Sequence, residues 1–365
     1  MQELGADEVV IAPISRPKFV VSKYTGWVRK GFRGTALDWI VNTGRSAELE
    51  DSFVHSLQGL SVALIHVNHV FTLGFARILQ HQLSRHQKIP LVLETHDVQS
   101  NLMHERQDLN PWTHKLDSSE ELLRSEIASL KEPDVLVHCS VEDFDFFSKE
   151  LPGKEHVLVL PTIDDSFINS VRAGDAQHKD PFDLLFVGQR TDVNFAAVRW
   201  FLEEVWAKIA HHSLRLRIVG AVQSLVQERT PELYQRFERS FVGPVDDLVG
   251  CYRNARCVIA PMVFGTGISM KTVEALGSAK PFVGTSKAFR GMPGAAIRRA
   301  GMKIHETPQE FADAILWALS NENEGASVSR QLYDTLFSKR ASFVSREAVL
   351  KSAQQIKTLG ARAGI

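Results

Sequence analysis

Short apolar runs alternate along the chain with longer segments in which apolar residues recur every three or four positions. The short runs predict buried strands, and the longer spacing predicts amphipathic helices. In the first half, the predicted strands are Val9–Ala12, Val62–Val67, Leu91–Thr95, Val135–Cys139 and Val157–Leu160. The predicted helices there are Ser46–Gln58, Leu73–His86, Ser118–Leu130 and Val141–Glu150. Such alternation is typical of a parallel sheet with helices on both faces.

The second half repeats this scheme. Its predicted strands are Leu184–Val187, Leu216–Val219, Val258–Ala260 and Phe282–Val283. Its predicted helices are Phe195–Ala210, Val245–Asn254, Ile268–Ala279 and Pro308–Leu319. Residues 167–181 hold few apolar side chains and predict a linker. We therefore expect an α/β protein of two doubly wound, Rossmann-like domains at residues 1–166 and 182–327, followed by a helical tail at 328–365.

A glycine-containing turn joins the predicted strand Val258–Ala260 to the helix after it. Gly265 and Gly267 let the backbone turn sharply and approach a ligand closely. The unpaired amides and the dipole of the next helix favour an anion there, so the turn predicts a phosphate or diphosphate site. Lys271 and Glu274 share one helix face, where a cation can meet phosphate and a carboxylate can bind sugar hydroxyls. The alternative is a turn without a ligand beside an ordinary surface ion pair.

The order of elements around this turn, from about Asp183 to Phe289, resembles the nucleotide-sugar half of the GT-B glycosyltransferases, specifically the retaining group called family 4. The turn is similar to the variant G-x-G-x-x-x-K-x-x-E-A, in which Thr266 stands where the commoner form has another glutamate. The resemblance implies two domains facing across a cleft, with the last helix crossing back to the first domain. It also implies that Glu274 binds the ribose of a nucleoside diphosphate sugar and belongs to the catalytic centre. Donor binding would then extend over the whole turn, including Gly265, Thr266, Gly267 and Lys271.

The start of the chain departs from this resemblance. Proteins of this kind begin with a strand, a glycine-containing turn and a helix before the strand equivalent to Val9–Ala12, whereas residues 1–6 are similar to the end of that first helix. We therefore expect the chain to begin inside a βαβ unit, through a late start or the loss of that element. Weak or absent sugar transfer is expected from this chain, with nucleotide binding kept because that site lies after Asp183.

Polar residues follow two neighbouring predicted strands of the first domain. His96 and Asp97 come directly after one strand, and Asn68 and His69 come after the other. A neutral imidazole can hydrogen-bond a sugar hydroxyl or take up a proton near pH 7. The resemblance implies that His96 is catalytic and lies near the transferred sugar, with the other three on the acceptor side. The alternative is that these histidines are structural.

Two further segments of the second domain are candidates for donor binding. Gly188 and Arg190 follow a predicted strand, and the resemblance implies that they line the diphosphate, where the planar fork of Arg190 could bind two oxygens. The alternative is that Arg190 caps its loop on the surface. Val242, Gly243 and Val245 belong to a V-G-P-V segment that is expected to hold the base through backbone groups.

Metal chemistry is not predicted. Asp143 and Asp145 match the D-x-D motif of another glycosyltransferase class, but they fall in the first turns of a predicted helix, where acids favour the helix dipole. The histidine pairs His66/His69, His81/His86 and His211/His212 lack further ligand partners. We expect no metal and no other cofactor, because helix amides, Lys271 and Arg190 would stabilise the leaving diphosphate.

Composition adds location and one local surface. The length of 365 residues indicates two domains, and the net charge is −1. The three cysteines form no C-x-x-C pair, which indicates a reduced, cytoplasmic protein. No apolar run reaches the ~18 residues of a membrane span, and the acidic N-terminus lacks signal-peptide features. The segment Arg16–Arg33 carries six basic residues with interleaved aromatics, which suits docking on anionic lipid on the inner membrane face. A solvated loop is the alternative, and no nucleic-acid motif is present.

Together these features predict a GT-B, retaining glycosyltransferase that moves a hexosyl unit from a nucleotide sugar to a glycan or lipid-linked acceptor. A non-catalytic GT-B relative that binds carbohydrate or a partner is one alternative. A sugar-nucleotide epimerase of the same architecture is another.

Overall fold

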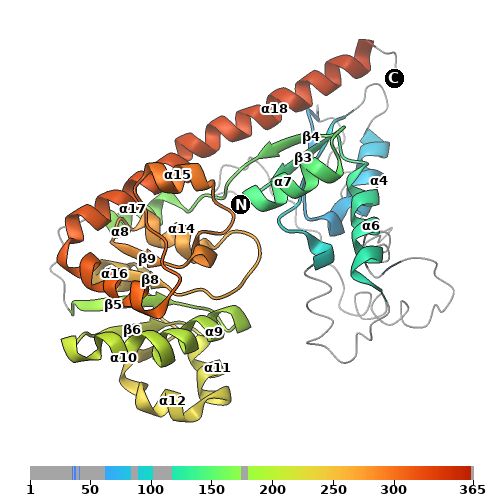
Figure 1. Ribbon diagram of the computed structural model, residues 1–365. Coiled ribbons are helices and arrows are strands. Elements are labelled where there is room, and N and C mark those ends of the chain that lie inside the picture. Colours follow the sequence, from blue (N-terminus) through green and yellow to red (C-terminus); the bar gives the residue numbers. More distant parts are fainter. Residues whose placement is uncertain are drawn as a thin grey trace. The chain divides into compact units, whose positions relative to one another are not determined.

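The computed structural model describes Thr35, Leu37, Val41 and residues 62–83, 89–101, 117–173 and 180–362 (Figure 1). The predicted strand Val9–Ala12, the predicted helix Ser46–Gln58 and the basic segment Arg16–Arg33 lie outside these residues. Contacts divide the described chain into two compact units. The first holds the residues up to His138, Asp143–Leu158 and those from Arg346 onward, and the second holds Cys139–Glu142 and Val159–Ser345.

The first unit contains a sheet of four parallel strands in the order β1-β2-β3-β4. The strands are β1 (Ile65–Asn68), β2 (Leu91–Glu94), β3 (Val135–His138) and β4 (Glu155–Leu158). The four strands predicted in this part of the chain are present, with β1 starting later and β4 starting earlier than the apolar runs indicate. Asn68 pairs with Glu94, and Glu94 pairs with Val137, so the carboxyl ends of the first three strands are level. Residues that follow β1 and β2 are thereby brought side by side.

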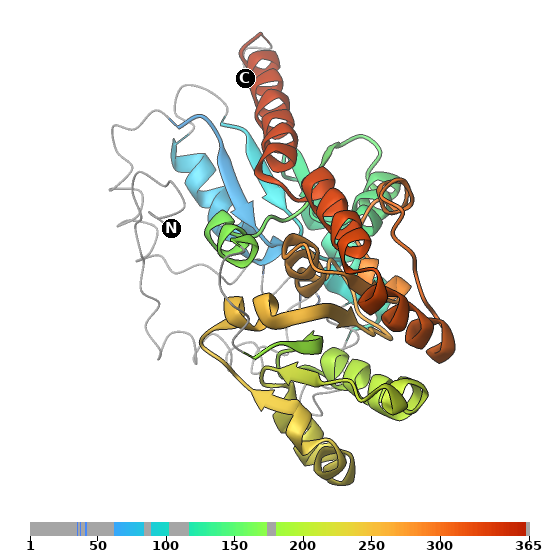
Figure 2. The same cartoon turned by 90° about the vertical axis from the view of Figure 1, so that its left-hand side faces the viewer.

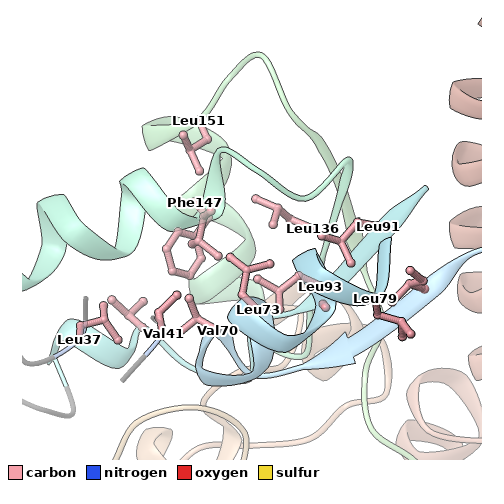
Figure 3. Close-up of a cluster of buried hydrophobic side chains, with 14 of the residues drawn as sticks. Leu37, Val41, Val70, Leu73, Leu79, Leu91, Leu93, Leu136, Phe147 and Leu151 are labelled. Atoms are coloured by element: carbon pink, nitrogen blue, oxygen red, sulfur yellow. The ribbon is translucent and has the colours of Figure 1, made fainter. Parts of the chain in front are cut away.

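Helices α4 (Leu73–Leu83), α6 (Ser119–Leu130) and α7 (Val141–Glu150) lie where the periodicity predicts them. Helix α6 starts at a capping box, in which Ser118 and Glu121 bind each other's backbone amides. The core between these helices and the sheet is formed by buried apolar side chains (Figure 3). Its members include Leu73, Leu79, Leu91, Leu93, Leu136 and Phe147.

The second unit contains a sheet of five parallel strands in the order β7-β6-β5-β8-β9. They are β5 (Phe182–Val187), β6 (Leu216–Val219), β7 (Phe241–Gly243), β8 (Ala255–Ala260) and β9 (Phe282–Gly284). Strand β7 is not among the predicted strands, because it has only three residues and exposes its central Val242. The chain proceeds from β5 to one edge and then returns to place β8 on the other side of β5. Ligands of such sheets bind at this switch point, beyond the carboxyl ends of the strands.

Helices cover both faces of this second sheet (Figures 1 and 2). One face carries α9 (Asp192–Trp200), a π-helical turn (Phe201–Val205), α10 (Trp206–Ile209) and α16 (Pro308–Ser320), which pack on one another. The other face carries α8 (Asp165–Arg172), α13 (Leu248–Asn254), α14 (Met270–Gly277) and α17 (Glu322–Leu336). The remaining helices are α11 (Val222–Arg229), α12 (Pro231–Arg236), α15 (Gly294–Arg299) and α18 (Lys339–Arg362).

Two segments differ from the sequence-based expectation. Helix α8 occupies part of the predicted linker, because Ile168 and Val171 are buried on one face and Asp164 caps its start. The tail forms two helices, α17 and α18, with the fully buried Phe337 between them. The division between the units falls inside α18, and its later part belongs to the first unit, where Ser352 donates a hydrogen bond to Glu155.

Candidate functional site

The turn after β8 has the backbone geometry that its glycines predict. Gly265 has φ 138° and Gly267 has φ 59°, values that residues with a side chain rarely adopt. The turn ends at Ser269, whose side chain makes no cap hydrogen bond to the amides of α14. Its Oγ lies 2.9 Å from Thr272 Oγ1, which donates to the Ala288 carbonyl at 2.8 Å. The first turn of α14 is therefore not capped by its own serine, which suits the anion site expected at this helix start.

Lys271 extends from α14 to the loop after β5. Its Nζ donates a hydrogen bond to Asn194 Oδ1 of α9, and it lies 4.9 Å from the ring centre of Phe186. Burial lowers the pKa of Lys271 to about 7, the positive charge of Arg290 acts in the same direction, and Glu274 opposes both. The Lys271 side chain thus reaches from the helix after β8 to residues of β5 and α9, at the switch point of the sheet.

Glu274 lies one helical turn further along the same face of α14. Its Oε2 accepts a hydrogen bond at 3.2 Å from the hydroxyl of Tyr252, a side chain of α13 that is fully buried. Burial raises the pKa of Glu274, while the Tyr252 hydrogen bond and Lys271 lower it. Lys271 and Glu274 are each held by a partner from another helix, so the simple surface ion pair does not describe them.

The loop after β5 shows why Gly188 is a glycine and adds a residue that the sequence analysis missed. A Cβ at Gly188 would lie 2.7 Å from the Phe186 ring and 3.2 Å from Asn194, so this glycine is required by packing. Asn194 is buried, and its Nδ2 donates to the carbonyl of Gln189 at 2.9 Å, which turns its Oδ1 toward Lys271. In the sequence, Asn194 could have been found as a polar residue in the first turn of the helix that follows the central strand.

Arg190 faces helix α11. Its Nη1 donates to Ser224 Oγ and its Nη2 to Glu228 Oε2, each at 2.7 Å. Arg190 thus forms an ion pair with Glu228, and both side chains are about half exposed. A contact of this guanidinium with a diphosphate stays a prediction, and in the structure its partner is a carboxylate.

Arg290, which the sequence analysis did not consider, lies against the glycine turn. It follows a short 3-10 turn (Ser286–Phe289) after β9, and its Nε donates to the carbonyl of Thr266 at 2.9 Å. Its Nη1 donates to the carbonyl of Lys287 at 2.7 Å. A Cβ at Gly265 would lie 3.0 Å from Arg290 Cζ, so the absence of a side chain at Gly265 makes room for the guanidinium. In the sequence, Arg290 could have been found as a basic residue that follows the strand next to β8.

The V-G-P-V segment lies at the end of β7. The carbonyl of Gly243 accepts a hydrogen bond from the Gly220 amide at 2.7 Å, so this backbone group joins two loops of the sheet. Val242 is 40% exposed and Val245 is half-buried. Apolar side chains of the glycine turn, Val263 and Phe264, are similarly exposed. Val242, Val263 and Phe264 are thus exposed apolar side chains of the second unit, and a role of the V-G-P-V segment in holding a base stays a prediction.

In the first unit, the structure brings together the residues predicted after β1 and β2. The rings of His69 and His96 stack with centroids 4.1 Å apart, and His96 Nε2 lies 3.1 Å from Asn68 Oδ1. Because a carbonyl oxygen only accepts, Nε2 is the donor in this contact. Asp97 follows His96 in the chain, and its amide donates to the Thr95 carbonyl at 2.9 Å.

Both stacked histidines have a strained backbone. His69 has φ 64° and His96 has φ 63°, a region that costs a non-glycine residue roughly 1–2 kcal/mol. The His69 amide donates to the Glu94 carbonyl at 2.9 Å, which fixes the turn after β1 to β2. Burial and the charge of His96 lower the pKa of His69, and Glu94 opposes this. Such strain at strand ends is typical of functional sites.

Comparison with known proteins supports a common architecture. Residues 181–321 match the family model described as glycosyl transferases group 1, and this range contains α9, the glycine turn and α14. The comparison with curated protein sequences found no match. Sucrose-phosphate synthase from Thermosynechococcus elongatus is 16% identical, with 85% of this chain and 79% of that chain covered and a TM-score of 0.54.

Two other solved structures are also similar to this chain in fold. HepE from Anabaena in complex with UDP and glucose is 16% identical, covering 83% of this chain and 81% of its own, with a TM-score of 0.52. An E. coli protein described as trehalose-6-phosphate, bound with UDP-2-fluoro glucose, is 15% identical, with 95% of this chain and 81% of that chain covered and a TM-score of 0.60. The chain has the GT-B fold. The resemblance drawn from the glycine turn is thereby confirmed for the GT-B fold, while family 4 in particular stays a prediction.

Two further features of the GT-B chain concern metals and membranes. Among the residues that the structure describes, no three His, Cys, Asp or Glu side chains gather as a metal ion would require. Asp143 and Asp145 both lie in α7, and Asp143 is buried. Within the same residues, no helix is both long and apolar enough to cross a membrane.

Proposed function

We propose that this GT-B protein is a glycosyltransferase that moves a hexosyl unit from a nucleoside diphosphate sugar to a glycan or lipid-linked acceptor, with retention and without a metal. The observation that carries the proposal is the pair Lys271 and Glu274, which α14 presents directly after the glycine turn at the switch point of the sheet. The solved HepE and E. coli structures, with UDP and glucose or UDP-2-fluoro glucose bound, support a donor of this class.

The donor chemistry follows from the surroundings of these two side chains. A protonated Lys271 and the first amides of α14 would offset the charge that develops on the leaving diphosphate. Since burial lowers the pKa of Lys271 to about 7, a bound diphosphate would raise it again and keep the lysine charged. Glu274, fixed by Tyr252, would accept hydrogen bonds from the two ribose hydroxyls.

The first unit would supply the groups that meet sugar. In this proposal Asn68, His69 and Asp97 bind the acceptor, and His96 is the catalytic histidine that hydrogen-bonds a hydroxyl of the transferred sugar. The polar contacts among these residues and the stacking of the two imidazoles support a shared role. The proposal includes a cytoplasmic location, with the segment Arg16–Arg33 on anionic lipid, which suits an acceptor embedded in a membrane.

A panel of nucleotides tests this function. Thermal unfolding is followed with UDP, ADP, GDP, the matching nucleosides and the glucose derivatives of each diphosphate. We expect one diphosphate to raise the melting temperature by several degrees, and its sugar derivative to be converted to the free diphosphate when a glycan acceptor is added. A protein that none of these nucleotides stabilises would contradict the proposal.

A non-catalytic GT-B relative is the second candidate, and Thr266 favours it. Thr266 stands where the commoner motif has a carboxylate, its side chain is exposed, and its carbonyl is taken by Arg290. Such a relative would bind a nucleotide or sugar in the panel but release no diphosphate with any acceptor. An epimerase would instead convert the donor to its epimer, which proton NMR of the sugar nucleotide detects.

A further inference from the structure

The loop after β2 carries His96 and Asp97, to which the proposed function gives roles at the sugar, and residues 99–101 after it are helical. His96 has φ 63°, a conformation that a residue with a side chain keeps only where its surroundings impose it. On the side of β2 the loop is fixed to β3, because the Thr95 amide donates to the Val137 carbonyl at 2.9 Å. On its other side the loop is held by a residue of α6.

That residue is Glu126, whose carboxylate binds the first two amides of the helical segment. Oε1 accepts from the Gln99 amide and Oε2 from the Ser100 amide, each at 2.8 Å. Amides in the first turn of a helix have no carbonyl partner within that helix, so an acceptor from outside stabilises them. A negative charge at this end also favours the helix dipole. Glu126 is therefore a cap supplied by another helix, 27 and 26 positions further along the chain.

The carboxylate of Glu126 is removed from water, since this residue is only 1% exposed. Burial raises the pKa of Glu126 and the charge of Asp143 on α7 adds to this, whereas the amide hydrogen bonds oppose it. A buried carboxylate is costly unless hydrogen bonds replace water, so it is a weak source of stability by itself. It does specify one path of the backbone, because both amides must lie within reach of the two oxygens at once.

A second carboxylate of α6 provides a comparison. Glu121 accepts from the Ser118 amide at 2.9 Å in the capping box of its own helix, and its side chain is exposed. Glu121 thus caps the element to which it belongs, whereas Glu126 joins α6 to the loop that carries His96. The two residues allow the general benefit of a cap to be separated from the placement of this loop.

We propose that Glu126 is a positioning residue of the first unit, which fixes the loop after β2 so that His96 keeps its strained conformation against His69. The two imidazoles stack with centroids 4.1 Å apart, and His96 Nε2 lies 3.1 Å from Asn68 Oδ1, so a displaced loop would break both contacts. The inference rests on the proposed function, in which His96 is the catalytic histidine. Glu126 acts through this loop and does not itself meet the sugar.

The test compares Glu126→Gln with Glu121→Gln, the matched loss of a charged cap on the same helix. Glutamine has the size of glutamate, but its side chain can accept through one oxygen only and turns a donor toward the second backbone amide. Proton NMR of the histidine side chains is recorded on the whole chain, and the His96 signals are identified by their loss in His96→Gln. Circular dichroism and thermal unfolding show whether each variant is folded.

We expect the His96 signals to move in Glu126→Gln and to keep their wild-type positions in Glu121→Gln. Stacked rings shift each other's proton signals, so loss of the contact with His69 should change both histidines together. This measurement needs no substrate, and a merely structural cap would not produce it. Unchanged His96 signals in folded Glu126→Gln would overturn the inference.

Sugar transfer gives the second readout. Glu126→Gln should lower kcat about 10- to 100-fold, because a small displacement of a catalytic group has effects of this size. Affinity for the preferred nucleoside diphosphate should stay at the wild-type level, since Lys271 and Glu274 belong to the second unit. Glu121→Gln should keep the wild-type kcat. Equal losses of kcat and diphosphate affinity in Glu126→Gln would contradict a positioning role.

The two readouts also separate this inference from the proposed function. If the wild type transfers no sugar but the His96 signals still move in Glu126→Gln, the proposed function is overturned while the placement of His96 by Glu126 stands. If transfer occurs and Glu126→Gln changes neither kcat nor the His96 signals, the inference alone is overturned.

A variant that keeps the charge covers the case in which Glu126→Gln does not fold. Glu126→Asp retains the carboxylate but withdraws it by one methylene group, so it should change kcat and the His96 signals in the same direction and to a smaller extent. A folded Glu126→Asp that is indistinguishable from the wild type would make Glu126 a residue of stability alone and overturn the inference. Loss of folding in both variants would do the same.

Discussion

At the scale of single residues, the function proposed for the second unit would depend on polar side chains that are partly removed from water. Lys271 and Glu274 each carry a pKa shifted by burial, and each is held by a side chain of another helix, Asn194 or Tyr252. Burial makes a charged group expensive in the absence of a ligand. The same burial makes its interaction with a complementary ligand stronger than it would be in water.

Glu274→Gln should weaken nucleotide binding at least tenfold without unfolding the protein. A hydrogen bond to a charged acceptor contributes about 1.5–3 kcal/mol, and the neutral amide loses this advantage at the ribose. Calorimetry with the preferred diphosphate measures the change, and far-UV circular dichroism confirms folding. Tyr252→Phe is the matched variant that keeps the carboxylate and removes its hydrogen bond, so its loss should be smaller. Unchanged affinity in Glu274→Gln would remove this residue from the site.

Lys271 should make diphosphate binding depend on pH around neutrality. Its pKa of about 7 in the free protein means that the charged form is fully present below that pH and is lost above it. Diphosphate affinity should therefore decline by up to tenfold per pH unit above 7, whereas nucleoside affinity stays flat. Lys271→Ala should abolish this decline and weaken the diphosphate far more than the nucleoside. Equal losses for both ligands would contradict a role in charge neutralisation.

At the scale of elements, the turn between β8 and α14 is defined by two glycines with different demands. Gly267 has φ 59°, where an alanine costs roughly 1–2 kcal/mol. Gly265 has φ 138° and lies against Arg290, so a side chain there is opposed by both the backbone and the guanidinium. The turn therefore has one position that tolerates a small change and one that does not.

Gly265→Ala should destabilise the protein more than Gly267→Ala and weaken diphosphate binding more strongly. Chemical denaturation gives the free energy of unfolding, and calorimetry gives the affinity. Gly301→Ala is the control, because Gly301 also has a positive φ of 74° but no atom lies within 4 Å of its Cβ position. It should lower stability by roughly 1 kcal/mol and leave binding unchanged. If Gly265→Ala behaved like this control, the turn would not be shaped around Arg290.

At the scale of the whole molecule, acid stability is set by a chain of hydrogen bonds across the first sheet. His156 Nε2 donates to the Leu151 carbonyl at 3.0 Å, which leaves its Nδ1 to accept from His138 Nε2 at 2.9 Å. Nδ1 of His138 in turn accepts from Thr95 Oγ1 at 3.1 Å. Burial, together with His156, lowers the pKa of His138 to about 3, so the His138 imidazole is neutral in the folded protein near neutral pH.

Stability should fall as the pH drops from about 6.5, the pKa of His138 in the unfolded chain, toward 3. The unfolded state binds this proton more readily, so each pH unit in that range costs about 1.4 kcal/mol. His138→Gln should remove that part of the slope, although it lowers stability at pH 7.5. Denaturation at pH 7.5, 6 and 5 measures both effects, with the exposed His81→Gln as the matched control. An unchanged slope in His138→Gln would exclude this histidine as the source.

The sequence by itself determined the α/β alternation, most strand and helix positions and the location of the glycine turn. Local rules suffice there: apolar runs specify buried strands, and positive φ requires glycine at Gly265 and Gly267. The histidines at the ends of β1 and β2 could also be predicted, because the ends of paired parallel strands meet at one edge.

Tertiary structure alone decided which side chains complete the site. Asn194, Tyr252 and Arg290 come from elements 77, 22 and 24 positions away from the residues they contact, and no local pattern links them. Arg190 shows the reverse case: its position predicted a phosphate contact, but the packing of α11 placed Glu228 beside it. Hydrophobic periodicity fixes where elements form, whereas the pairing of polar groups depends on which elements pack together, and that is determined only when the chain folds.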